Sequence, residues 1–528
     1  MICALALPAC TLAFGQPSEY ESFEEGVPPH FTATRPDSLT ISPSHSKQGR
    51  RSLRWDWAGG EELVIRHGIG DPARRGGLSK ACRACFAVWL YMEQPLADAL
   101  VFEFREGDKV TGSFRFPLQF TGWRQGRPYY AAFPVGKPTA AVDNIRIAAP
   151  TPTPRGTVFL DFIKYNTLTY ANRAIVPEQQ MLWRPPAPDE KRFPKPDRVT
   201  AEQQAGIRKL LGAGQGAGVN EKRVQDLCAA VQALGIVRDD DGLRGGPSID
   251  RHYQYCANAG EHGVKESTYW PDEGGPGWLG METPARLTSL GYQLAAAHRE
   301  STDPEQRRRL AEAFLLVEEH LFDQGMQAGA GFDWNWWVGE GWANAVFMMR
   351  DVLARAGHLG RQCDAMLWNY GGGDLFAGTD PPSNMDYYHL YLRSLLRACL
   401  VQVEPEEQVR WLNAFQAMLE KSMLQPTSAL KLDGSAYHHS VHYFAYARNA
   451  FATLPDLMQE LNGTPWRLGA AAHERVRRAM LAQRLYCNQL DLPLSLSGRR
   501  PFGTDFYSKG IDRVTPASLD ALARCGTP

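Results

Sequence analysis

The sequence predicts a multidomain α+β protein in which an antiparallel β-sandwich precedes a domain built from helices. From about residue 21 to 170 the chain carries short runs of alternating apolar and polar residues, such as SLRWDW and TVFLDFI. This period of two, with Gly, Pro and Asp between the runs, is typical of half-buried strands. From about residue 201 onward apolar residues recur at i, i+3, i+4 and i+7, the period of an amphipathic helix. A chain of 528 residues is too long for one compact core, so at least two domains are expected.

The first segment of the chain, residues 1–17, has the apolar character of a signal or lipoprotein-like segment. The string MICALALPACTLAFGQ is apolar and is followed at once by the polar string PSEYESFEEG. No later stretch is long and apolar enough to span a bilayer. We therefore expect a secreted or periplasmic protein without a transmembrane segment.

The predicted sandwich covers residues 18–170, and a linker covers residues 171–200. The linker includes WRPPAPDEKRFPKPDR, whose prolines and charges exclude a regular helix or a central strand. Residues 201–528 hold seven or more helical runs joined by long loops rich in Gly, Trp and Asp. This pattern favours an α/α toroid whose loops line a cleft. An irregular bundle or a solenoid is the alternative, although no fixed-length repeat supports a solenoid.

The charge balance argues against a protein that attracts nucleic acid through an overall excess of positive charge. Lys and Arg total 57 against 58 Asp and Glu, which gives a net charge of −1. An acidic polymer would therefore need a local cluster of arginines, and no nucleic-acid partner is expected. The ten cysteines include a single C-x-x-C, at Cys82 and Cys85, just before a strand-like run. A zinc ribbon would need a second such pair, so two structural thiols or a disulfide are the interpretations left open.

Four tryptophans fall within twelve residues in GFDWNWWVGEGW, residues 331–342. Trp342 lies inside a helical pattern and is expected to pack in the core. Trp336 and Trp337 instead share a Gly-rich stretch with Asn335. Flat apolar rings beside polar groups suit the faces of sugars, so sugar binding and aromatic packing are both open for this stretch.

The string SAYHHSVHYFAYARNA, residues 435–450, holds three histidines in five positions beside four Tyr or Phe rings. If a helix begins near His439, then His439 and Tyr446 lie on one face about two turns apart. A metal site of His438, His439 and His442 is disfavoured, because no carboxylate is adjacent and neighbouring histidines point apart. Buried core histidines are a second interpretation. The third is a proton-transfer pair of one imidazole and one tyrosine hydroxyl.

The string LPLSLSGRRPFG places Arg499 and Arg500 in a turn after a helix. Adjacent arginines are usually solvated, but at a cleft their paired donors suit carboxylate or sulfate groups. A set of His, Tyr, Arg and Asn suits β-elimination on a uronic acid, in which donors to the carboxylate stabilise the anion formed when the C5 proton leaves. A glycoside hydrolase would instead need two carboxylates, for which Asp333 and Glu340 are the candidates.

Motifs in both halves resemble those of polysaccharide lyases of the chondroitin ABC lyase type, relatives of the chondroitin AC and hyaluronate lyases. SFEEGVPPHF, FAVWLYMEQP and GTVFLDFI are similar to that family's N-terminal jelly roll. HLFDQG, NWW, DGSAYHH and GRRPF are similar to its helical catalytic domain. The resemblance implies cleavage of chondroitin or dermatan sulfate, or of hyaluronan, by β-elimination. It implies no cofactor for the chemistry, while a structural divalent cation stays open.

Carried over position by position, the resemblance also assigns roles to individual residues. It makes His439 and Tyr446 the catalytic pair, and Arg499 the residue that supports the tyrosine and the leaving oxygen. Asn335 would help to neutralise the uronate carboxylate. The further substrate contacts expected are Trp336, Trp337, His438 and Arg500.

The chain departs from the family's pattern at its end. Family members continue into large antiparallel β-domains that supply a catalytic glutamate and close the cleft. The sequence stops at Pro528, shortly after GRRPFG. We therefore expect an incomplete toroid without that glutamate and poor turnover by the chain as given. A non-catalytic glycan-binding relative, or a fragment, is the alternative to a lyase.

Overall fold

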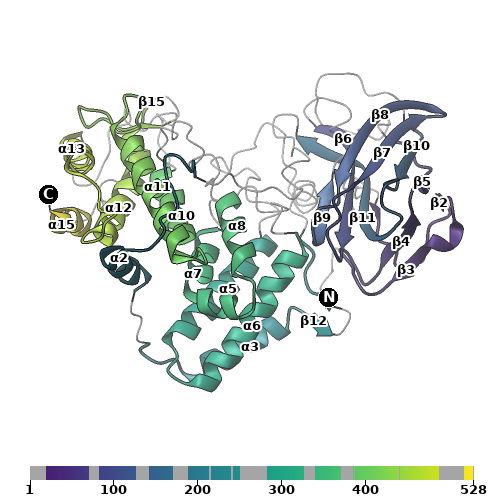
Figure 1. Ribbon diagram of the computed structural model, residues 1–528, viewed down its shortest axis with the longest axis horizontal. Helices are drawn as coiled ribbons and strands as arrows, with labels where there is room; N and C mark the ends of the chain where they lie inside the picture. The colour runs from purple at the N-terminus through teal and green to yellow at the C-terminus, as the bar shows by residue number, and fades with distance from the viewer. Residues whose placement is uncertain are drawn as a thin grey trace, which may run out of the picture. The chain divides into compact units, whose positions relative to one another are not determined.

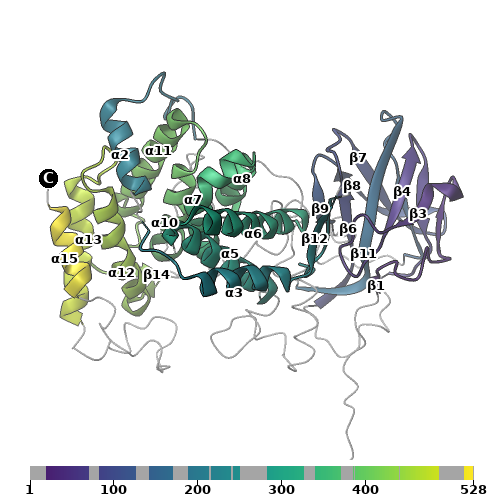
Figure 2. The same cartoon turned by 90° about the horizontal axis from the view of Figure 1, so that it is seen from below.

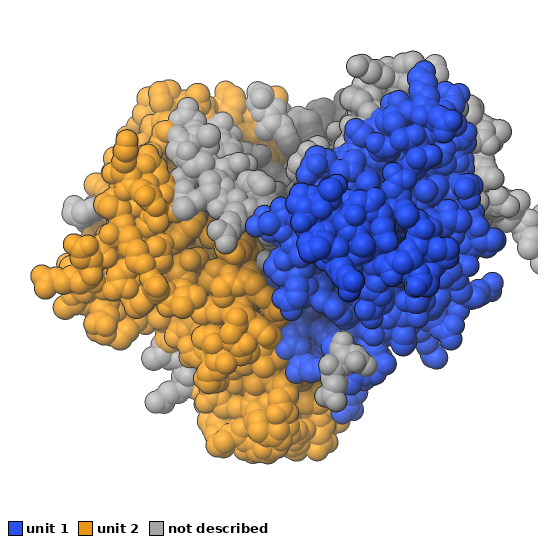
Figure 3. Space-filling model, turned by 45° about the vertical axis from the view of Figure 1, so that its right-hand side comes forward, with its two compact units in different colours: residues 1–183, 231–286, 316–333 blue, residues 184–230, 287–315, 334–528 orange. Residues whose placement is uncertain are grey.

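In the computed structural model the chain divides into two compact units. One comprises residues 1–183, 231–286 and 316–333, and the other residues 184–230, 287–315 and 334–528 (Figure 3). Strands dominate the first unit and helices the second (Figure 1). The structure describes residues 20–69, 82–126, 142–170, 188–212, 216–239, 242–249, 282–325, 339–369, 385, 387–438, 441–486 and 516–526.

The first unit contains a sandwich of two antiparallel sheets. One sheet has the order β3-β4-β11-β6-β9, with β1 added on β11, and the other the order β2-β5-β10-β7-β8. A short hairpin, β12 with β13, belongs to the same unit. The strands are β1 (Tyr20–Glu21), β2 (Phe31–Ala33), β3 (Leu39–Ser42), β4 (Ser52–Ala58), β5 (Glu62–Ile65), β6 (Cys82–Met92), β7 (Ala99–Glu106), β8 (Lys109–Pro117), β9 (Gly122–Gly126), β10 (Asn144–Ala148), β11 (Arg155–Tyr170), β12 (Ile236–Asp239) and β13 (Gly242–Gly245), with a 3-10 turn, η1 (Pro36–Ser38), before β3.

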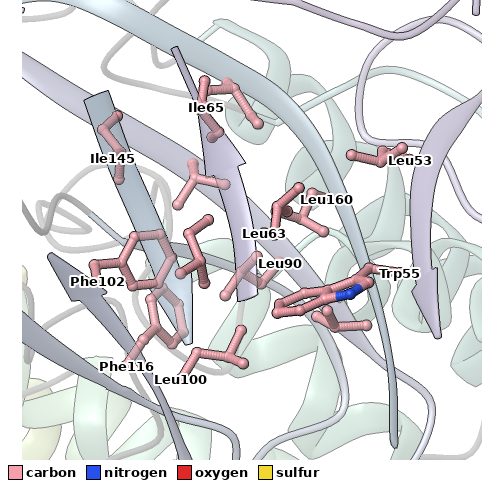
Figure 4. Packing of buried hydrophobic residues seen from close by; sticks show 14 of the residues in the cluster. Leu53, Trp55, Leu63, Ile65, Leu90, Leu100, Phe102, Phe116, Ile145 and Leu160 are labelled. Atoms are coloured by element: carbon pink, nitrogen blue, oxygen red, sulfur yellow. The ribbon is translucent and has the colours of Figure 1, made fainter. Parts of the chain in front are cut away.

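The sandwich core follows from the alternation in the sequence. In β4, Leu53, Trp55 and Trp57 are buried, whereas Arg54 and Asp56 between them are partly exposed. Corresponding side chains of the other strands meet them between the sheets (Figure 4). Burying one such side chain contributes about 1.5–3 kcal/mol, so this core is a main source of the sandwich's stability. Cys82 and Cys85 lie within β6 rather than before it.

The predicted helical region after residue 200 is also present in the structure. Helix α2 begins at Ala201, where Thr200 and Gln203 form a capping box with hydrogen bonds of 3.1 and 2.9 Å. The helices are α2 (Ala201–Leu211), α3 (Glu221–Gln232), α5 (Glu282–Glu300), α6 (Pro304–Asp323), α7 (Gly339–Arg355), α8 (Leu359–Asn369), α10 (Leu392–Leu400), α11 (Pro405–Leu424), α12 (Phe444–Leu461), α13 (Ala470–Tyr486) and α15 (Pro516–Cys525), with a π-helical turn, η6 (Tyr387–Tyr391), before α10.

The helices pack through their apolar faces. Helix α10 lies against α7, α8 and α11, while α12 lies against α13 and α15 (Figure 2). Trp342 of α7 is 1% exposed, stacks on Phe314 at 5.5 Å, and donates its indole N–H to Gln362 at 3.2 Å. Its predicted packing role is therefore confirmed. None of the helices within the described ranges is both long and apolar enough to cross a membrane.

Candidate active site

The histidine-rich segment forms a β-hairpin rather than the start of a helix. β14 (Tyr437–His438) pairs antiparallel with β15 (Val441–His442), with Tyr437 opposite His442 and His438 opposite Val441. His439 and Ser440, which separate the two strands in the sequence, lie outside the described residues. Helix α12 begins only at Phe444, so the expectation of a helix from His439 is wrong.

Hydrogen bonds to neighbouring backbone explain why this segment is extended. The Tyr437 N–H donates to Ala429 O and the Tyr443 N–H to Ala436 O, both at 2.8 Å. Leu430 and Ala436 form an isolated antiparallel bridge just before the hairpin. These bonds satisfy backbone groups that a helix over the same residues would have to pair differently.

An aspartate turn precedes the hairpin, and the sequence prediction missed it. The Asp433 carboxylate accepts hydrogen bonds from the Ser435 N–H at 2.8 Å and from the Ser435 hydroxyl at 2.7 Å. These bonds lower the pKa of Asp433. Gly434 follows with φ of 85°, a conformation that favours glycine. The Asp-Gly pair in KLDGSAY was the signal that could have indicated this turn.

His442 contacts aromatic rings of the hairpin, of α12 and of α13. It stacks on Tyr437, with ring centroids 5.6 Å apart and planes 18° apart, and meets Phe444 and Tyr486 edge-on. Burial lowers the pKa of His442, although the Asp433 carboxylate acts in the opposite direction. The ring is therefore expected to be neutral near pH 7.

His438 lies on the opposite side of the hairpin and is 1% exposed. Its ring lies 5.8 Å from that of the buried Tyr443. Cross-strand partners share a face, so His438 and His442 belong to opposite faces, which argues against one metal ion bound by both. Among the residues that the structure describes, no group of three or more His, Cys, Asp or Glu could hold a metal ion. The burial of His438 also argues against the predicted direct contact with substrate and favours support of the hairpin.

One other predicted site residue lies on an element that the structure describes. Tyr446 is the third residue of α12, in its first turn. The remaining predicted residues lie outside the described ranges, namely His439, Arg499, Arg500, Asn335, Trp336 and Trp337. Their roles stay predictions. Glu340, the candidate of a hydrolase, lies in the first turn of α7, and Asp333 is outside the described ranges.

Two family models match the chain. The model described as "Lyase, N terminal" matches residues 18–182, and the model described as "Lyase, catalytic" matches residues 279–528. The antiparallel sandwich lies within the first match and the hairpin within the second. Fold and matches together define a lyase with an N-terminal sandwich and a helical catalytic region.

Three curated relatives align with nearly the whole chain. A chondroitin sulfate ABC exolyase of Proteus vulgaris is 25% identical over 544 residues, covering 96% of this chain and 53% of the relative. An exolyase of the same name from Bacteroides thetaiotaomicron is 25% identical, covering 96% and 51%. A chondroitin sulfate ABC endolyase of Proteus vulgaris is 23% identical, covering 92% and 52%. The chain belongs to the polysaccharide lyases of the chondroitin ABC lyase type, as its motifs predicted, and spans about half the length of these relatives.

Proposed function

We propose that the protein is a polysaccharide lyase that cleaves uronic-acid-containing glycosaminoglycans by β-elimination. The observation that carries this proposal is the alignment of almost the entire chain with three relatives that are named chondroitin sulfate lyases. Chondroitin and dermatan sulfate are therefore the first substrates to test, with hyaluronan as an unsulfated third. The chemistry needs no cofactor.

The reaction transfers a proton from carbon to oxygen. A base removes the proton at C5 of the uronic acid, and the C–H electrons form the C4–C5 double bond. The C4–O4 bond breaks, and an acid protonates the departing oxygen. We assign these transfers to His439 and Tyr446, with Asn335 donating to the uronate carboxylate and Arg499 to the leaving oxygen. Fixed donors aimed at the developing charge supply most of the rate enhancement in such sites.

The sequence positions of the two residues support this assignment, because they fall at the hairpin and at the start of the helix that follows it. In the sequence His439 falls between β14 and β15, and Tyr446 is the third residue of α12.

We further propose that the protein acts outside the cytoplasm, secreted or in the periplasm. The apolar residues 1–17 support this location, and so does the substrate class, since acidic polymers of this size do not cross membranes unaided.

Ultraviolet absorbance and mass spectrometry test the proposed function. Purified protein is incubated separately with chondroitin sulfate, dermatan sulfate and hyaluronan. Elimination yields an unsaturated uronate that absorbs in the ultraviolet, with products lighter by one water than those of hydrolysis. Binding without new products would identify a non-catalytic glycan-binding protein, and saturated products would identify a hydrolase. The size distribution of early products separates exolytic from endolytic cleavage, which the relatives do not, since both names occur among them.

A further inference from the structure

A second buried aromatic cluster lies on the sandwich, on the face of its first sheet that points away from the main core. It consists of Trp89, Trp123, Phe159 and Phe162, with Tyr91 packed beside them. Trp89 is 1% exposed and Trp123 is fully buried. Exposed tryptophans on a sheet would suggest a platform for sugars, but these rings are covered. The last turns of α6, residues 316–323, belong to the same unit as this face.

Lys47 joins the sandwich to the carboxyl end of α6. The side chain is 2% exposed and its ammonium donates to Gln324 O at 2.7 Å. The same nitrogen lies 3.6 Å from the centroid of the Trp89 ring. The final carbonyls of a helix lack helical partners and carry partial negative charge, so a buried cation here satisfies and stabilises the helix end.

Asp161 of β11 fixes the backbone from which Lys47 projects. Its fully buried carboxylate accepts three backbone N–H groups, from Lys47 at 2.6 Å, Gln48 at 2.9 Å and Phe162 at 2.6 Å. Burial raises the pKa of Asp161, and the three bonds act in the opposite direction. A carboxylate that holds two consecutive N–H groups of a loop leaves little freedom in the direction of the lysine.

The start of β9 is shaped to accept the same helix end. Gly122 has φ of 75°, and a Cβ at that position would lie 3.1 Å from the carbonyl oxygens of both Phe322 and Asp323. Asp323 hydrogen-bonds with the Tyr91 hydroxyl and is attracted by Lys47 and Arg124, while burial raises its pKa to about 6. A side chain at position 122 would push the helix end away from these partners.

Contacts from residues 247–249 of the same unit also hold this helix end. The Ile249 N–H donates to the Gln324 side-chain oxygen at 3.3 Å, and the His320 ring bonds with Pro247 O at 2.9 Å. The carboxyl end of α6 is therefore held both by the sandwich and by residues 247–249. After Gly325 the chain runs on to Asn335, Trp336 and Trp337 and returns in α7 at Gly339.

We propose that the sandwich contributes to the reaction indirectly. Lys47 is a positioning residue that fixes the end of α6, and from this helix end the chain continues to Asn335. In this proposal the cluster around Trp89 and Trp123 is the surface on which the end of α6 packs, and it is not a glycan-binding surface. This inference rests on the proposed lyase function for its effect on turnover. The contact itself does not depend on that function.

The test compares Lys47→Met, Lys47→Arg and a control in the sandwich core, Leu63→Ala. The methionine keeps the aliphatic stem on Trp89 and removes the ammonium, whereas the arginine keeps a cation that can reach Gln324 O. Leu63 is fully buried between the sheets, so the control lowers the melting temperature without touching α6. Turnover is measured well below every melting temperature and corrected for the folded fraction. Hydrogen exchange is measured on a peptide covering residues 316–325.

We expect Lys47→Met to lower kcat about ten- to hundredfold, the range for misplaced catalytic groups, and to raise KM. Exchange in residues 316–325 should accelerate in Lys47→Met alone, and Lys47→Arg should recover most of the activity. Wild-type kinetics in Lys47→Met, or an equal loss of corrected kcat in Leu63→Ala, would overturn the proposal.

A milder variant covers the case in which Lys47→Met does not fold. Tyr91→Phe removes only the hydroxyl that bonds with Asp323, and about a fivefold loss of kcat is expected from one hydrogen bond. Unchanged kinetics together with unchanged hydrogen exchange in Tyr91→Phe would then refute the proposal that the sandwich positions the end of α6. If the wild-type protein forms no unsaturated product from any glycosaminoglycan, the proposed function fails, while the exchange comparison still decides whether Lys47 holds the helix end.

Discussion

The contact of Lys47 with Trp89 and Gln324 O, called the joint below, lies in the first unit, and the hairpin around His442 lies in the second. The two regions use similar groups but differ in their exposure to solvent. Each combines aromatic rings, a basic side chain and an aspartate that accepts at least one backbone N–H group. In the joint the tryptophans are sealed, whereas Tyr437 and Tyr486 of the hairpin region are 36% and 44% exposed. The difference in solvent access separates a region that holds the fold from a region that can meet a ligand.

The two aspartates show the physical cause most directly. Asp161 accepts three N–H groups and Asp433 accepts one, together with a hydroxyl. The pKa of Asp161 is nevertheless raised and that of Asp433 lowered. Desolvation outweighs hydrogen bonding in the buried joint, and hydrogen bonding outweighs desolvation at the exposed turn. Hydrogen bonds alone therefore do not indicate whether a carboxylate stays charged.

Removing the predicted proton-transfer groups should give the largest effect. We expect His439→Ala and Tyr446→Phe each to lower kcat by roughly 10²–10⁴, the usual contribution of a general acid or base, with melting temperature nearly unchanged. The rate of ultraviolet-absorbing product measures this. Tyr437→Phe is the matched control, because it makes the same chemical change on the exposed face of the hairpin. Equal activity of Tyr446→Phe and the control would remove Tyr446 from the chemistry.

The next effect concerns geometry at constant charge. Arg499→Lys should lower kcat by about 10²–10³, the range for losing one donor to a developing anion, because a lysine lacks the rigid paired donors of the guanidinium. Arg478→Lys on α13, an exposed arginine, provides the control. Near-normal turnover of Arg499→Lys would make Arg499 a surface residue.

At the joint, the expected effect is on stability and depends on pH. Burial lowers the pKa of His320 from 6.5 to about 4. The unfolded chain therefore binds more protons than the folded one between pH 4 and 6.5, and the free energy of unfolding rises with pH across this window. The loss on acidification is about 3 kcal/mol for this shift. His320→Gln, followed by denaturant unfolding at several pH values, should flatten the curve. A slope equal to that of the wild type would show that His320 does not titrate in this way.

The smallest effect is expected for sugar contacts. Replacing Trp336 and Trp337 by alanine should raise KM about three- to tenfold, since an aromatic contact is worth about 0.5–1.5 kcal/mol, and should change kcat less. Initial rates over a range of polymer concentrations measure both constants. A fall in kcat at constant KM would instead place these rings beside the reacting atoms.

The sequence predicted the elements well where local periodicity decides them. Alternation placed Trp55 and Trp57 in the sandwich, and the helical period placed Trp342 in the core. The prediction of a helix beginning near His439 failed, because backbone hydrogen bonds to Ala429 and Ala436 favour an extended segment despite the helical spacing of the rings. The joint was beyond prediction for another reason. Lys47 and Gln324 are 277 residues apart, and a lone lysine in a polar loop carries no sign of burial.

The path of the chain between the two units limits how this protein can be divided or recombined. Successive segments alternate between the units, so the sandwich shares its compact unit with residues 231–286 and 316–333. In the proposed arrangement, a piece ending near residue 182, where the first family match ends, would lack the helix end that covers Trp89 and Trp123. It would also leave Lys47 without Gln324 O. Such a piece should aggregate unless another apolar surface covers those rings. Chimeras with other lyases should therefore exchange the end of α6 together with the sandwich.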